Sequence, residues 1–439
     1  MESGIKTQIV VVGGGAGGLG LVRKLACEYR RDTHDVTLVD MNRTHIWKPL
    51  LHEVAAGSLD ASMDEVGYGG HAGKWGYRFF LGKLESIDRE NRTITTAPLI
   101  DPDGERVLDR QEIPFDYLVL AIGGVSNDFG VPGVRENAMF LDYRQDSDKF
   151  RHKLLNACFR ANLAKRSGEK GKQQVRVCVI GGGATGVELS AELYNAATKL
   201  HKFGLSEFDD KMLKVTLLEA GDRILPMLNE ELALTAQNEL SELGVDVRTS
   251  TQVTEISKGL VHVKEGASVE ADLIVWAAGV KAANETRGMS DLELARGNQF
   301  VVRPTLQTTK DERIFAIGDC CSCTLPGEER PVPPRAQSAH QMSSTVLKNI
   351  NSLQRNEPLQ DFVYNDKGSL VSLSRFSAVG SLMGNLVGGR MAIEGRLARL
   401  AYASLYRMHI LAVHGLLRGL TLILAGHVNQ IVRPKLKLH

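Results

Sequence analysis

The chain has 439 residues, enough for two or three domains with their own cores. Its 43% hydrophobic and 24% charged content excludes a disordered or fibrous chain. The formal net charge is +1, but residues 390–439 hold eight Lys/Arg and one acid, a net of +7, so residues 1–389 sum to −6. A basic tail on an acidic body indicates an anionic partner surface, either membrane or nucleic acid.

Six cysteines are scattered along the chain, and no secretory signal precedes the first apolar run. This usage predicts free thiols in a reducing, cytosolic compartment rather than a disulfide framework. The longest uncharged apolar stretch near the tail, Gly419–Val432, has 14 residues. A helix that crosses a bilayer needs about 20 residues, so we expect no membrane span.

A glycine-rich motif follows the first β-branched run, Gln8–Val12, and precedes a helical pattern over Leu19–Tyr29. In G-x-G-x-x-G spacing the first glycine allows a tight turn, and the second lets the backbone approach a pyrophosphate. The third lets helix and strand pack closely, so that the phosphates meet the helix N-terminus. The residues of this motif are Gly13, Gly15, Ala16, Gly17 and Gly18.

The second β run, Val36–Asp40, ends in an acid 22 residues after Gly18. A carboxylate at this place accepts a hydrogen bond from an adenosine ribose 2′-hydroxyl and disfavours a 2′-phosphate. A generic glycine turn with a surface aspartate is the alternative. Since strand, glycines, helix, strand and acid all fall in register, we predict a dinucleotide site.

A second motif of the same kind lies in Val177–Glu192, where Val187–Leu193 has a helical pattern. The β run Leu213–Glu219 again ends in an acid, which favours NADH over NADPH. Glu219 comes 33 residues after Gly186, longer than the usual ~20. We interpret the polar excess around 201–211 as an extension of helix and loop. The motif residues are Gly181, Gly183, Ala184 and Gly186.

Glycine-ended strands repeat as well, which indicates an internal duplication of dinucleotide-binding folds. Phe115–Gly124 and Leu273–Gly279 are matching buried runs, and Ile314–Asp319 returns the chain to the first fold. The second dinucleotide domain is therefore predicted to be inserted in the first. Residues 41–112 are predicted to alternate short strands with turns, interrupted at 47–52, and the helical patterns that remain are Gln145–Lys165 and Glu230–Leu243.

These motifs together resemble the flavoproteins with two dinucleotide-binding domains, over about residues 7–345. The resemblance implies FAD at the N-terminal motif with Asp40, and again at the late Gly-Asp. It implies NADH at the inserted motif with Glu219. The further cofactor-binding residues that it implies are Lys48, Ala121, Gly123, Gly279, Gly318 and Asp319.

Two features narrow the resemblance to the type II, single-subunit NADH:quinone oxidoreductases. Ala336–Gln341 fits the A-Q-x-A-x-Q pattern that lies beside the flavin ring and quinone pocket in that family. The tail, ASLYRMHILAVHG followed by NQIVRPKLKLH, resembles the membrane-anchoring end of enterobacterial members. With the tail the resemblance covers essentially the full length.

The expected fold is α/β, with two Rossmann-like dinucleotide-binding domains and a C-terminal amphipathic helical membrane-anchoring region. Residues 1–172 are expected to form the first part of the FAD-binding domain, and 301–375 its second part with the quinone-site motif. Residues 173–300 are the expected NADH-binding domain, and 376–439 the anchoring region.

Three residues are the catalytic candidates. The resemblance places Glu188 near nicotinamide and flavin, as a proton relay or a nicotinamide-positioning group; otherwise it complements a helix dipole. Gln337 and Gln341 are four apart and share a helix face, where neutral amides can hydrogen-bond a quinone carbonyl; otherwise they are polar residues at a domain contact. Trp47–Pro49 lies where family members cover the flavin.

The cysteine trio at 320, 321 and 323 suggests a soft metal site, but a complete zinc set is missing. We therefore interpret the trio as small apolar residues beside the flavin-contacting Gly-Asp, and predict no metal. Residues 41–56 contain no cysteine, so the C-x-x-x-x-C of disulfide reductases is absent and thiol relay chemistry is not expected. Sulfide:quinone oxidoreductases also need redox cysteines, and those present are poorly placed.

The tail has the pattern of a long basic amphipathic helix, broken at Gly415 or Gly419. Arg396, Arg407 and Arg418 recur every 11 residues and so return to nearly one angle, with Arg399 and His414 close to that face. Such a helix would lie on an anionic membrane; packing on the body or a dimer interface is the alternative. The opposite, apolar face consists of Leu397, Leu400, Leu405, Met408, Leu411, Leu416, Leu420 and Ile423.

The favoured function is FAD-dependent NADH:quinone oxidoreduction at the cytoplasmic face of a bacterial inner membrane, without proton pumping. The alternatives are a soluble NADH-dependent reductase of a carrier protein, and a nucleotide-binding sensor with a vestigial flavin. The apolar face argues against nucleic acid. Ubiquinone or menaquinone as acceptor, a homodimer, and ternary-complex or ping-pong order stay open.

Overall fold

The computed structural model describes residues 6–101, 103–169, 173–373, 377–384 and 389–432. The chain forms two compact units, each built from three separate stretches. Unit 1 is Met1–Trp47, Glu65–Val125 and Val280–Asn365. Unit 2 is Lys48–Asp64, Ser126–Gly279 and Asp366–His439. These units cut across the domain ranges expected above, which remain a prediction of which segments bind which nucleotide.

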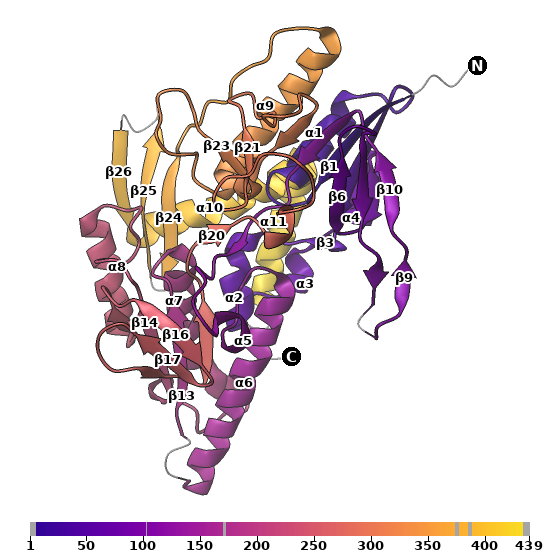
Figure 1. Cartoon of the computed structure of the whole chain (residues 1–439). Coiled ribbons are helices and arrows are strands. Elements are labelled where there is room, and N and C mark those ends of the chain that lie inside the picture. The colour runs from indigo at the N-terminus through magenta and orange to yellow at the C-terminus, as the bar shows by residue number, and fades with distance from the viewer. Residues whose placement is uncertain (1–5, 102, 170–172, 374–376, 385–388, 433–439) are drawn as a thin grey trace. The chain divides into compact units, whose positions relative to one another are not determined.

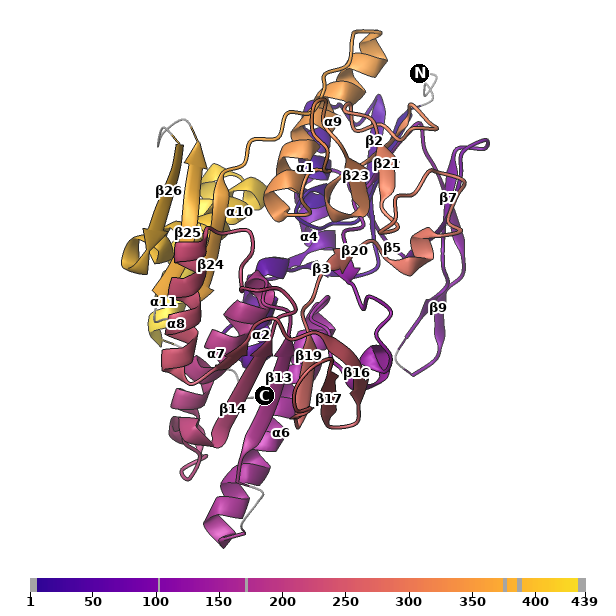
Figure 2. The same cartoon turned by 60° about the vertical axis from the view of Figure 1, so that its left-hand side comes forward.

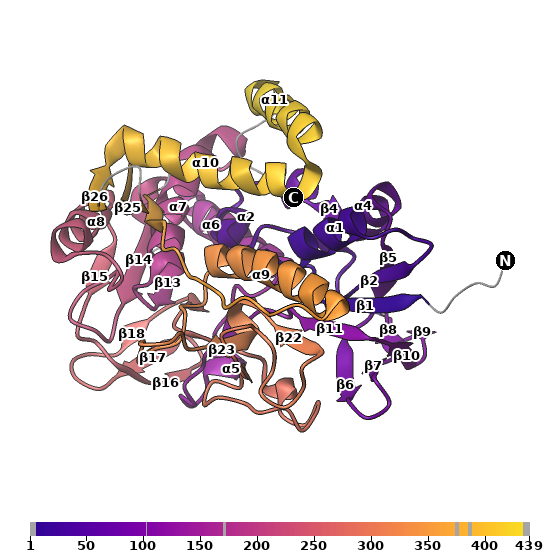
Figure 3. The ribbon, with the colours of Figure 1, turned by 90° about the horizontal axis from the view of Figure 1, so that it is seen from above.

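A five-stranded parallel sheet is the centre of unit 1, in the order β22-β11-β1-β2-β5. Figure 1 labels its middle strand, β1, and Figure 3 labels all five strands. The chain enters at β1, moves outward to one edge, and then returns to the other side of β1. This reversal between β1 and β11 is the place where open α/β sheets bind ligands. The strands are β1 (Thr7–Val12), β2 (His34–Asp40), β5 (Arg78–Leu81), β11 (Tyr117–Leu120) and β22 (Ile314–Ala316).

Among the described residues of unit 1, the other elements are three helices and several short strands. Helices α1 and α9 pack against each other. The helices are α1 (Gly18–Glu28), α4 (Tyr68–Trp75) and α9 (Ala336–Arg355), with 3₁₀ turns η4 (Asn284–Thr286) and η5 (Gly318–Cys320). The strands are β3 (Thr44–His45), β4 (Val66–Gly67), β6 (Leu84–Asp88), β7 (Thr93–Thr96), β8 (Leu99–Ile100), β9 (Arg106–Leu108), β10 (Gln111–Pro114), β20 (Val280–Lys281), β21 (Phe300–Val302) and β23 (Cys321–Cys323); β12 (Val125–Ser126) spans the boundary between the units.

Unit 2 repeats the parallel plan with four strands in the order β15-β14-β13-β19 (Figure 2). Here too the chain begins in the interior and reverses, now between β13 and β19. The strands are β13 (Val175–Ile180), β14 (Leu213–Leu218), β15 (Asp246–Arg248) and β19 (Leu273–Trp276). The expected α/β class with two Rossmann-like folds is therefore confirmed.

Helices and two antiparallel sheets complete unit 2. Helix α2 packs against α6 and α7, and α10 packs against β25. The helices are α2 (Leu51–Ala56), α3 (Ala61–Asp64), α5 (Val134–Asn137), α6 (Arg144–Ser167), α7 (Ala184–Leu200), α8 (Glu230–Leu243), α10 (Gly395–His414) and α11 (Leu416–Val432), with 3₁₀ turns η1 (Lys48–Leu50), η2 (His201–Phe203) and η3 (Asp210–Met212). The antiparallel strands are β16 (Val253–Ser257), β17 (Leu260–Val263), β18 (Val269–Glu270), β24 (Gly368–Leu373), β25 (Ser377–Gly384) and β26 (Gly389–Glu394).

Helices α1 and α6 match the predicted ranges to within two residues, and α8 matches residue for residue, whereas α7 extends well beyond the predicted Val187–Leu193. The reading of residues 41–112 as strands and turns is wrong in part, because α2, α3 and α4 lie there. The three-stranded sheet β24-β25-β26 was not foreseen. Both omissions involve short segments that are stabilised by their packing partners, which local patterns do not reveal.

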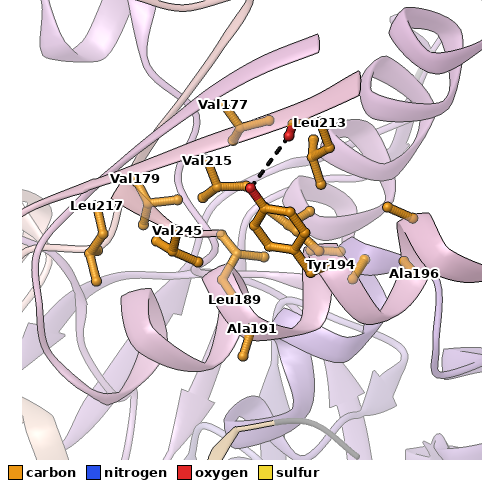
Figure 4. Packing of buried hydrophobic residues seen from close by; sticks show 14 of the residues in the cluster. Val177, Val179, Leu189, Ala191, Tyr194, Ala196, Leu213, Val215, Leu217 and Val245 are labelled. Carbon is orange, nitrogen blue, oxygen red and sulfur yellow. Dashed lines mark hydrogen bonds between the residues drawn. The ribbon is translucent and has the colours of Figure 1, made fainter. Parts of the chain in front are cut away.

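The main core of unit 2 lies between its parallel sheet and helix α7 (Figure 4). Tyr194 is buried there, 5% exposed, with its ring among aliphatic side chains. Its hydroxyl donates to the carbonyl of Gly244 at 2.7 Å and lies 3.4 Å from that of Leu213. A buried tyrosine thus joins the end of α8 to the sheet and satisfies its own polar atom.

We expect Tyr194→Phe to lower the free energy of unfolding by about 1 kcal/mol, because the Gly244 carbonyl loses its donor from the buried tyrosine. The measurement is the thermal midpoint of the holoprotein. Tyr194→Leu is the comparison, since it also removes ring packing and should cost more. An unchanged midpoint for Tyr194→Phe contradicts this role.

Candidate functional site

The first nucleotide loop, between β1 and α1, is held tight by glycines. A Cβ on Gly13 would lie 2.3 Å from the carbonyl oxygen of Ala121, and one on Gly18 would lie 1.8 Å from that of Gly13. Gly13 also has a φ of +99°, which L side chains rarely adopt. Space around Gly15 is open, with no atom within 4 Å of its Cβ position. The loop therefore fits a pyrophosphate passing over Gly15 toward the α1 N-terminus.

Asp40, at the end of β2, fastens this loop. Its Oδ2 accepts from the Gly14 N–H at 2.6 Å, and its Oδ1 accepts from the Asn42 N–H at 2.7 Å. The Tyr68 hydroxyl donates to the Gly14 carbonyl at 2.9 Å. Burial raises the pKa of Asp40, while these hydrogen bonds oppose the shift. The Asp40 carboxylate can accept a further hydrogen bond from a ribose hydroxyl.

The second loop, between β13 and α7, has the same construction. A Cβ on Gly186 would lie 2.0 Å from the carbonyl oxygen of Gly181, and Gly181 has a φ of +112°. The space around Gly183 is open. Glu219 accepts from the Gly182 N–H at 2.6 Å and from the Gly221 N–H at 2.7 Å.

The longer spacing to Glu219 is thus harmless to the register. The 17-residue α7, η2, η3 and the turns between them absorb the extra residues before β14 begins. The acid still ends beside its glycine loop, as Asp40 does in unit 1. Ala184 is the first residue of α7, and Gly279 follows β19 with a φ of +65°.

Unit 1 gathers its remaining predicted cofactor residues at the ends of β1, β11 and β22. A Cβ on Gly17 or on Gly318 would meet Ala339 of α9 at 2.9 and 3.1 Å. A Cβ on Gly124 would lie 3.0 Å from that of Asp319. Ala121 and Gly123 follow β11, beside Gly13. These contacts bring the N-terminal motif, the β11 end and the late Gly-Asp together.

Lys48 belongs to unit 2, where its Nζ lies 5.1 Å from the ring centroid of Tyr143, a cation–π contact. Gln337 and Gln341 share a face of α9 in unit 1. The Gln341 amide donates to the Asn365 carbonyl at 2.9 Å and accepts from the Asn365 N–H at 3.0 Å. This pairing gives Gln341 a structural task at the loop that follows α9.

Glu188 lies in the first turns of α7 with a side chain 8% exposed. Its Oε1 accepts from the Ser372 N–H of β24 at 3.1 Å, and its Oε2 is 3.5 Å from His52 Nδ1. Burial raises the pKa of Glu188 to about 8. The buried hydroxyl of Tyr402 lies near Glu188 and lowers this pKa, although its geometry is outside that of a standard hydrogen bond.

Further acids surround Glu188, and the sequence reading missed them. Burial, with Glu192 and Asp64 nearby, raises the pKa of Glu53 to about 8. Burial also raises the pKa of Asp64, which accepts from the Tyr406 hydroxyl at 2.7 Å. We name Glu53, Asp64, Glu188 and Glu192 the acid cluster; all four belong to unit 2. The only sequence signal is the pair His52-Glu53 within an apolar run, LLHEVAA.

The cysteine trio is buried in unit 1, in β23 and η5. Cys320 Sγ lies 3.4 Å from the Leu120 carbonyl, and Cys321 Sγ lies 3.7 Å from Met342 Sδ. Burial raises the pKa of Cys320 to about 12 and of Cys323 to about 11. Since the thiolate is the metal ligand and the nucleophile, this environment disfavours both roles. Within the described residues no group of three or more His, Cys, Asp or Glu side chains is arranged to hold a metal ion.

The C-terminal helices α10 and α11 meet at Gly415, whose φ is +78° (Figure 3). Ala398 and Val413 of α10 are buried, whereas Leu405 and Met408 are exposed. Among the described residues no helix is both long and apolar enough to cross a bilayer. The apolar residues exposed on α11 are Leu416, Leu417, Leu420, Leu422, Leu424 and Val428.

Of the predicted basic face, Arg418 is exposed on α11 and Arg407 is half-buried on α10. The side chains of Arg396, Leu397, Arg399 and Leu400 lie outside the described residues, as do residues 433–439.

The pyridine nucleotide-disulphide oxidoreductase family matches residues 7–343. A type II NADH:quinone oxidoreductase of Haemophilus influenzae is 44% identical, over 98% of this chain and 99% of the relative. The chain belongs to the type II NADH:quinone oxidoreductases. A Staphylococcus aureus type II NADH:quinone oxidoreductase is 31% identical over 88% of the chain and 92% of its own length. The family resemblance drawn from the motifs is confirmed.

A solved structure of NDH2 from Plasmodium falciparum, in complex with NADH, has the same fold. It superimposes with a TM-score of 0.83 at 20% identity and covers 99% of this chain and 100% of its own. The extent of the match includes the segments after residue 343, which the family match does not reach.

We expect Glu219→Gln to raise the KM for NADH by about tenfold. The Glu219 carboxylate accepts from two backbone N–H groups, and the amide of glutamine has only one oxygen, so one of these N–H groups loses its acceptor. The preference for NADH over NADPH should fall, since the repulsion of a 2′-phosphate is removed. Steady-state rates with both nucleotides test this. The neighbouring exposed Asp222→Asn is the charge-matched control and should leave both constants unchanged.

Proposed function

We propose that this chain oxidises NADH and reduces a membrane quinone, with FAD at the unit 1 loop and NADH at the unit 2 loop. FAD, when bound, accepts a hydride from NADH and passes two electrons to the quinone. The observation that carries the proposal is the pair of acid-fastened glycine loops, one in each unit. Membership of the type II family supplies the acceptor class.

The residues of unit 1 hold the flavin by shape and by backbone dipoles. Gly15 leaves room for the pyrophosphate, and the α1 N-terminus presents free N–H groups and a positive dipole end. Asp40 would receive the adenosine ribose, and the Gly318-Asp319 turn, packed on α9, would hold the rest of the cofactor.

In unit 2 the matching roles belong to Gly183 and Glu219 for NADH. Gln337 is the proposed quinone contact on α9, while Gln341 holds the adjacent loop through Asn365. Lys48 is the proposed flavin cover, held against the Tyr143 ring.

Glu188 is the proposed proton donor for quinone reduction, which consumes two protons. A carboxyl with a pKa of about 8 carries its proton at pH 7 and can release it to a more basic acceptor. Its place in the first turns of α7, buried under β24, excludes bulk water from the carboxyl. Nicotinamide positioning is the competing role, and it predicts a slower hydride step instead.

We expect Glu188→Gln to slow quinone reduction by about 10²-fold and leave flavin reduction by NADH unchanged. The wild-type quinone rate should fall as pH rises through about 8, where Glu188 loses its proton, and the variant should lack this fall. Stopped-flow measurement of both half-reactions across pH separates the two roles. A slowed hydride step would assign Glu188 to nicotinamide positioning.

The same pKa shift has a stability readout. Because the folded pKa is raised, folding loses stability as pH rises from about 4.5, the unperturbed value, through about 8. The thermal midpoint of Glu188→Gln should therefore decline less over this window than that of the wild type.

We further propose that α11 binds an anionic membrane surface, at the cytoplasmic face of a bacterial inner membrane. Leu417 is 81% exposed and Leu424 69% exposed, and a helix that exposes such leucines fits lipid. The basic residues 433–439 and Arg418 would meet the head groups. A soluble carrier reductase has no use for these exposed leucines, which is why that alternative is weaker. The alternative to test is that a second copy of this chain covers the apolar face of α11 in a homodimer.

We expect truncation after Gly415 to abolish reduction of a long-chain quinone in anionic liposomes and to keep the rate with ferricyanide. This cut removes α11 but retains Tyr402 and Tyr406 beside the acid cluster. The double variant Leu417→Glu, Leu424→Glu should behave alike, and Leu163→Glu on α6, 64% exposed, is the control. Equal liposomal rates for the truncated and full-length proteins would contradict the membrane-binding role of α11. A shift from dimer to monomer on truncation would assign α11 to self-association.

A further inference from the structure

His52 stands between two acids of the cluster, and the roles proposed so far give it no task. Its Nδ1 is 3.5 Å from Glu188 Oε2, and its Nε2 is 3.9 Å from Glu53 Oε1. The ring is 3% exposed, on the short helix α2 that packs against α6 and α7. The imidazole thus has the buried Glu188 carboxyl beside one nitrogen and the more exposed Glu53 carboxyl beside the other.

Solvent access differs between the two carboxyls. The Glu188 side chain is 8% exposed, whereas that of Glu53 is 26% exposed. Once Glu188 has given up a proton it must be recharged from solvent, and its own contact with water is small. Glu53 is the acid through which a proton can enter.

We propose that His52 relays protons from Glu53 to Glu188. The inference rests on the proposed role of Glu188 as proton donor. In one transfer the Glu53 carboxyl gives its proton to Nε2 while Nδ1–H gives its proton to the Glu188 carboxylate. Glu53 becomes a carboxylate, Glu188 becomes neutral, and the imidazole stays neutral in its other tautomer. Glu53 then takes a proton from water, and the ring must return to its first tautomer before a second transfer.

The charge state of the ring fits this concerted route. Burial lowers the pKa of His52 to about 4, against the opposing effects of Glu192 and the Pro49 carbonyl. An imidazolium is therefore scarce at pH 7, so the relay passes through neutral tautomers. The distances of 3.5 and 3.9 Å are long for hydrogen bonds and must shorten, or be bridged by water, during transfer.

The groups around the ring come from several elements. Glu188 and Glu192 lie on α7, Glu53 on α2 and Asp64 on α3. Helix α10 contributes Tyr402, whose pKa burial and Glu188 raise well above its usual value, and Tyr406, which donates to Asp64. On α6, the buried Arg151 donates to Asp148. Burial raises the pKa values of Glu53, Asp64 and Glu188, whereas the hydroxyls of Tyr402 and Tyr406 lower those of Glu188 and Asp64.

His52 does not touch the reacting groups; it is a positioning and relay residue, so its test needs readouts that a structural role leaves unmoved. We expect His52→Gln to slow flavin reoxidation by quinone about tenfold, with flavin reduction by NADH unchanged. Proton uptake from solvent in a single turnover, followed with a pH-indicator dye, should slow equally. Added imidazole should restore both rates in His52→Ala.

Glu53→Gln should match His52→Gln, and the double variant should lose no more than either single variant, because the two act in series. His262→Gln is the matched control, a partly buried histidine that contacts Ser257 and Ser268 in the β16-β17-β18 sheet. It should leave every rate unchanged. The two single variants keep the test valid if one of them folds poorly.

The outcomes separate the relay from the role of Glu188. Loss of quinone reduction in Glu188→Gln with wild-type behaviour of His52→Gln and Glu53→Gln overturns the relay and leaves the proton donor in place. Wild-type quinone reduction in Glu188→Gln overturns both. Additive losses in the double variant overturn the series arrangement.

Discussion

Each nucleotide loop depends on a glycine, Gly18 in unit 1 and Gly186 in unit 2, at a position with no room for a side chain. A single methyl group on Gly18 or Gly186 would fall within 2.0 Å of a backbone carbonyl oxygen, so no other residue lets the helix N-terminus come this close to its strand. The free N–H groups of that helix start are what a pyrophosphate needs. The ability of each unit to bind a pyrophosphate therefore depends on one position that only glycine can occupy.

The acids complete this arrangement in both units. Asp40 and Glu219 each accept from the N–H of the motif's second residue, at 2.6 Å in both cases. A carboxylate that holds the loop from the next strand fixes the loop before any nucleotide arrives, which reduces the ordering cost on binding. The glycine at the helix start and the acid on the next strand recur in both units, so the internal duplication repeats the same pair of physical constraints.

Features of this kind are local, and they could be predicted from sequence. Strand, glycines, helix and acid follow each other closely, so both loops and the central parallel sheets were found. Helix α2 was missed because LLHEVAA is too short to show helical periodicity, and packing on α6 and α7 stabilises it. The sheet β24-β25-β26 was missed for a similar reason, since its glycine-rich strands gain their order from α7, α8 and α10.

The acid cluster lies beyond any local pattern. Its members come from α2, α3 and α7, with tyrosines from α10, and only the folded unit brings them together. Family resemblance alone singles out Glu188 in the sequence, and no sequence pattern assigns a role to His52 or Glu53. Such a cluster opposes folding at alkaline pH, because burial raises the pKa values of Glu53 and Glu188 to about 8 and favours their protonated forms. Acids retained at that expense in the interior point to proton chemistry rather than to stability.

The C-terminal helices show how one amphipathic pattern can hold two tasks. Read from sequence, α10 and α11 form a single apolar face opposed to a basic one, and the whole tail is an anchor. In the structure α10 turns Ala398, Tyr402, Tyr406 and Val413 inward, and the tyrosines face the acid cluster, while α11 leaves its leucines exposed. The pattern could not distinguish these helices, because leucines buried by protein and leucines buried by lipid look alike. Because Tyr402 and Tyr406 of α10 lie beside the acid cluster, a change in α10 acts on these acids, whereas a change in the exposed leucines of α11 leaves them untouched.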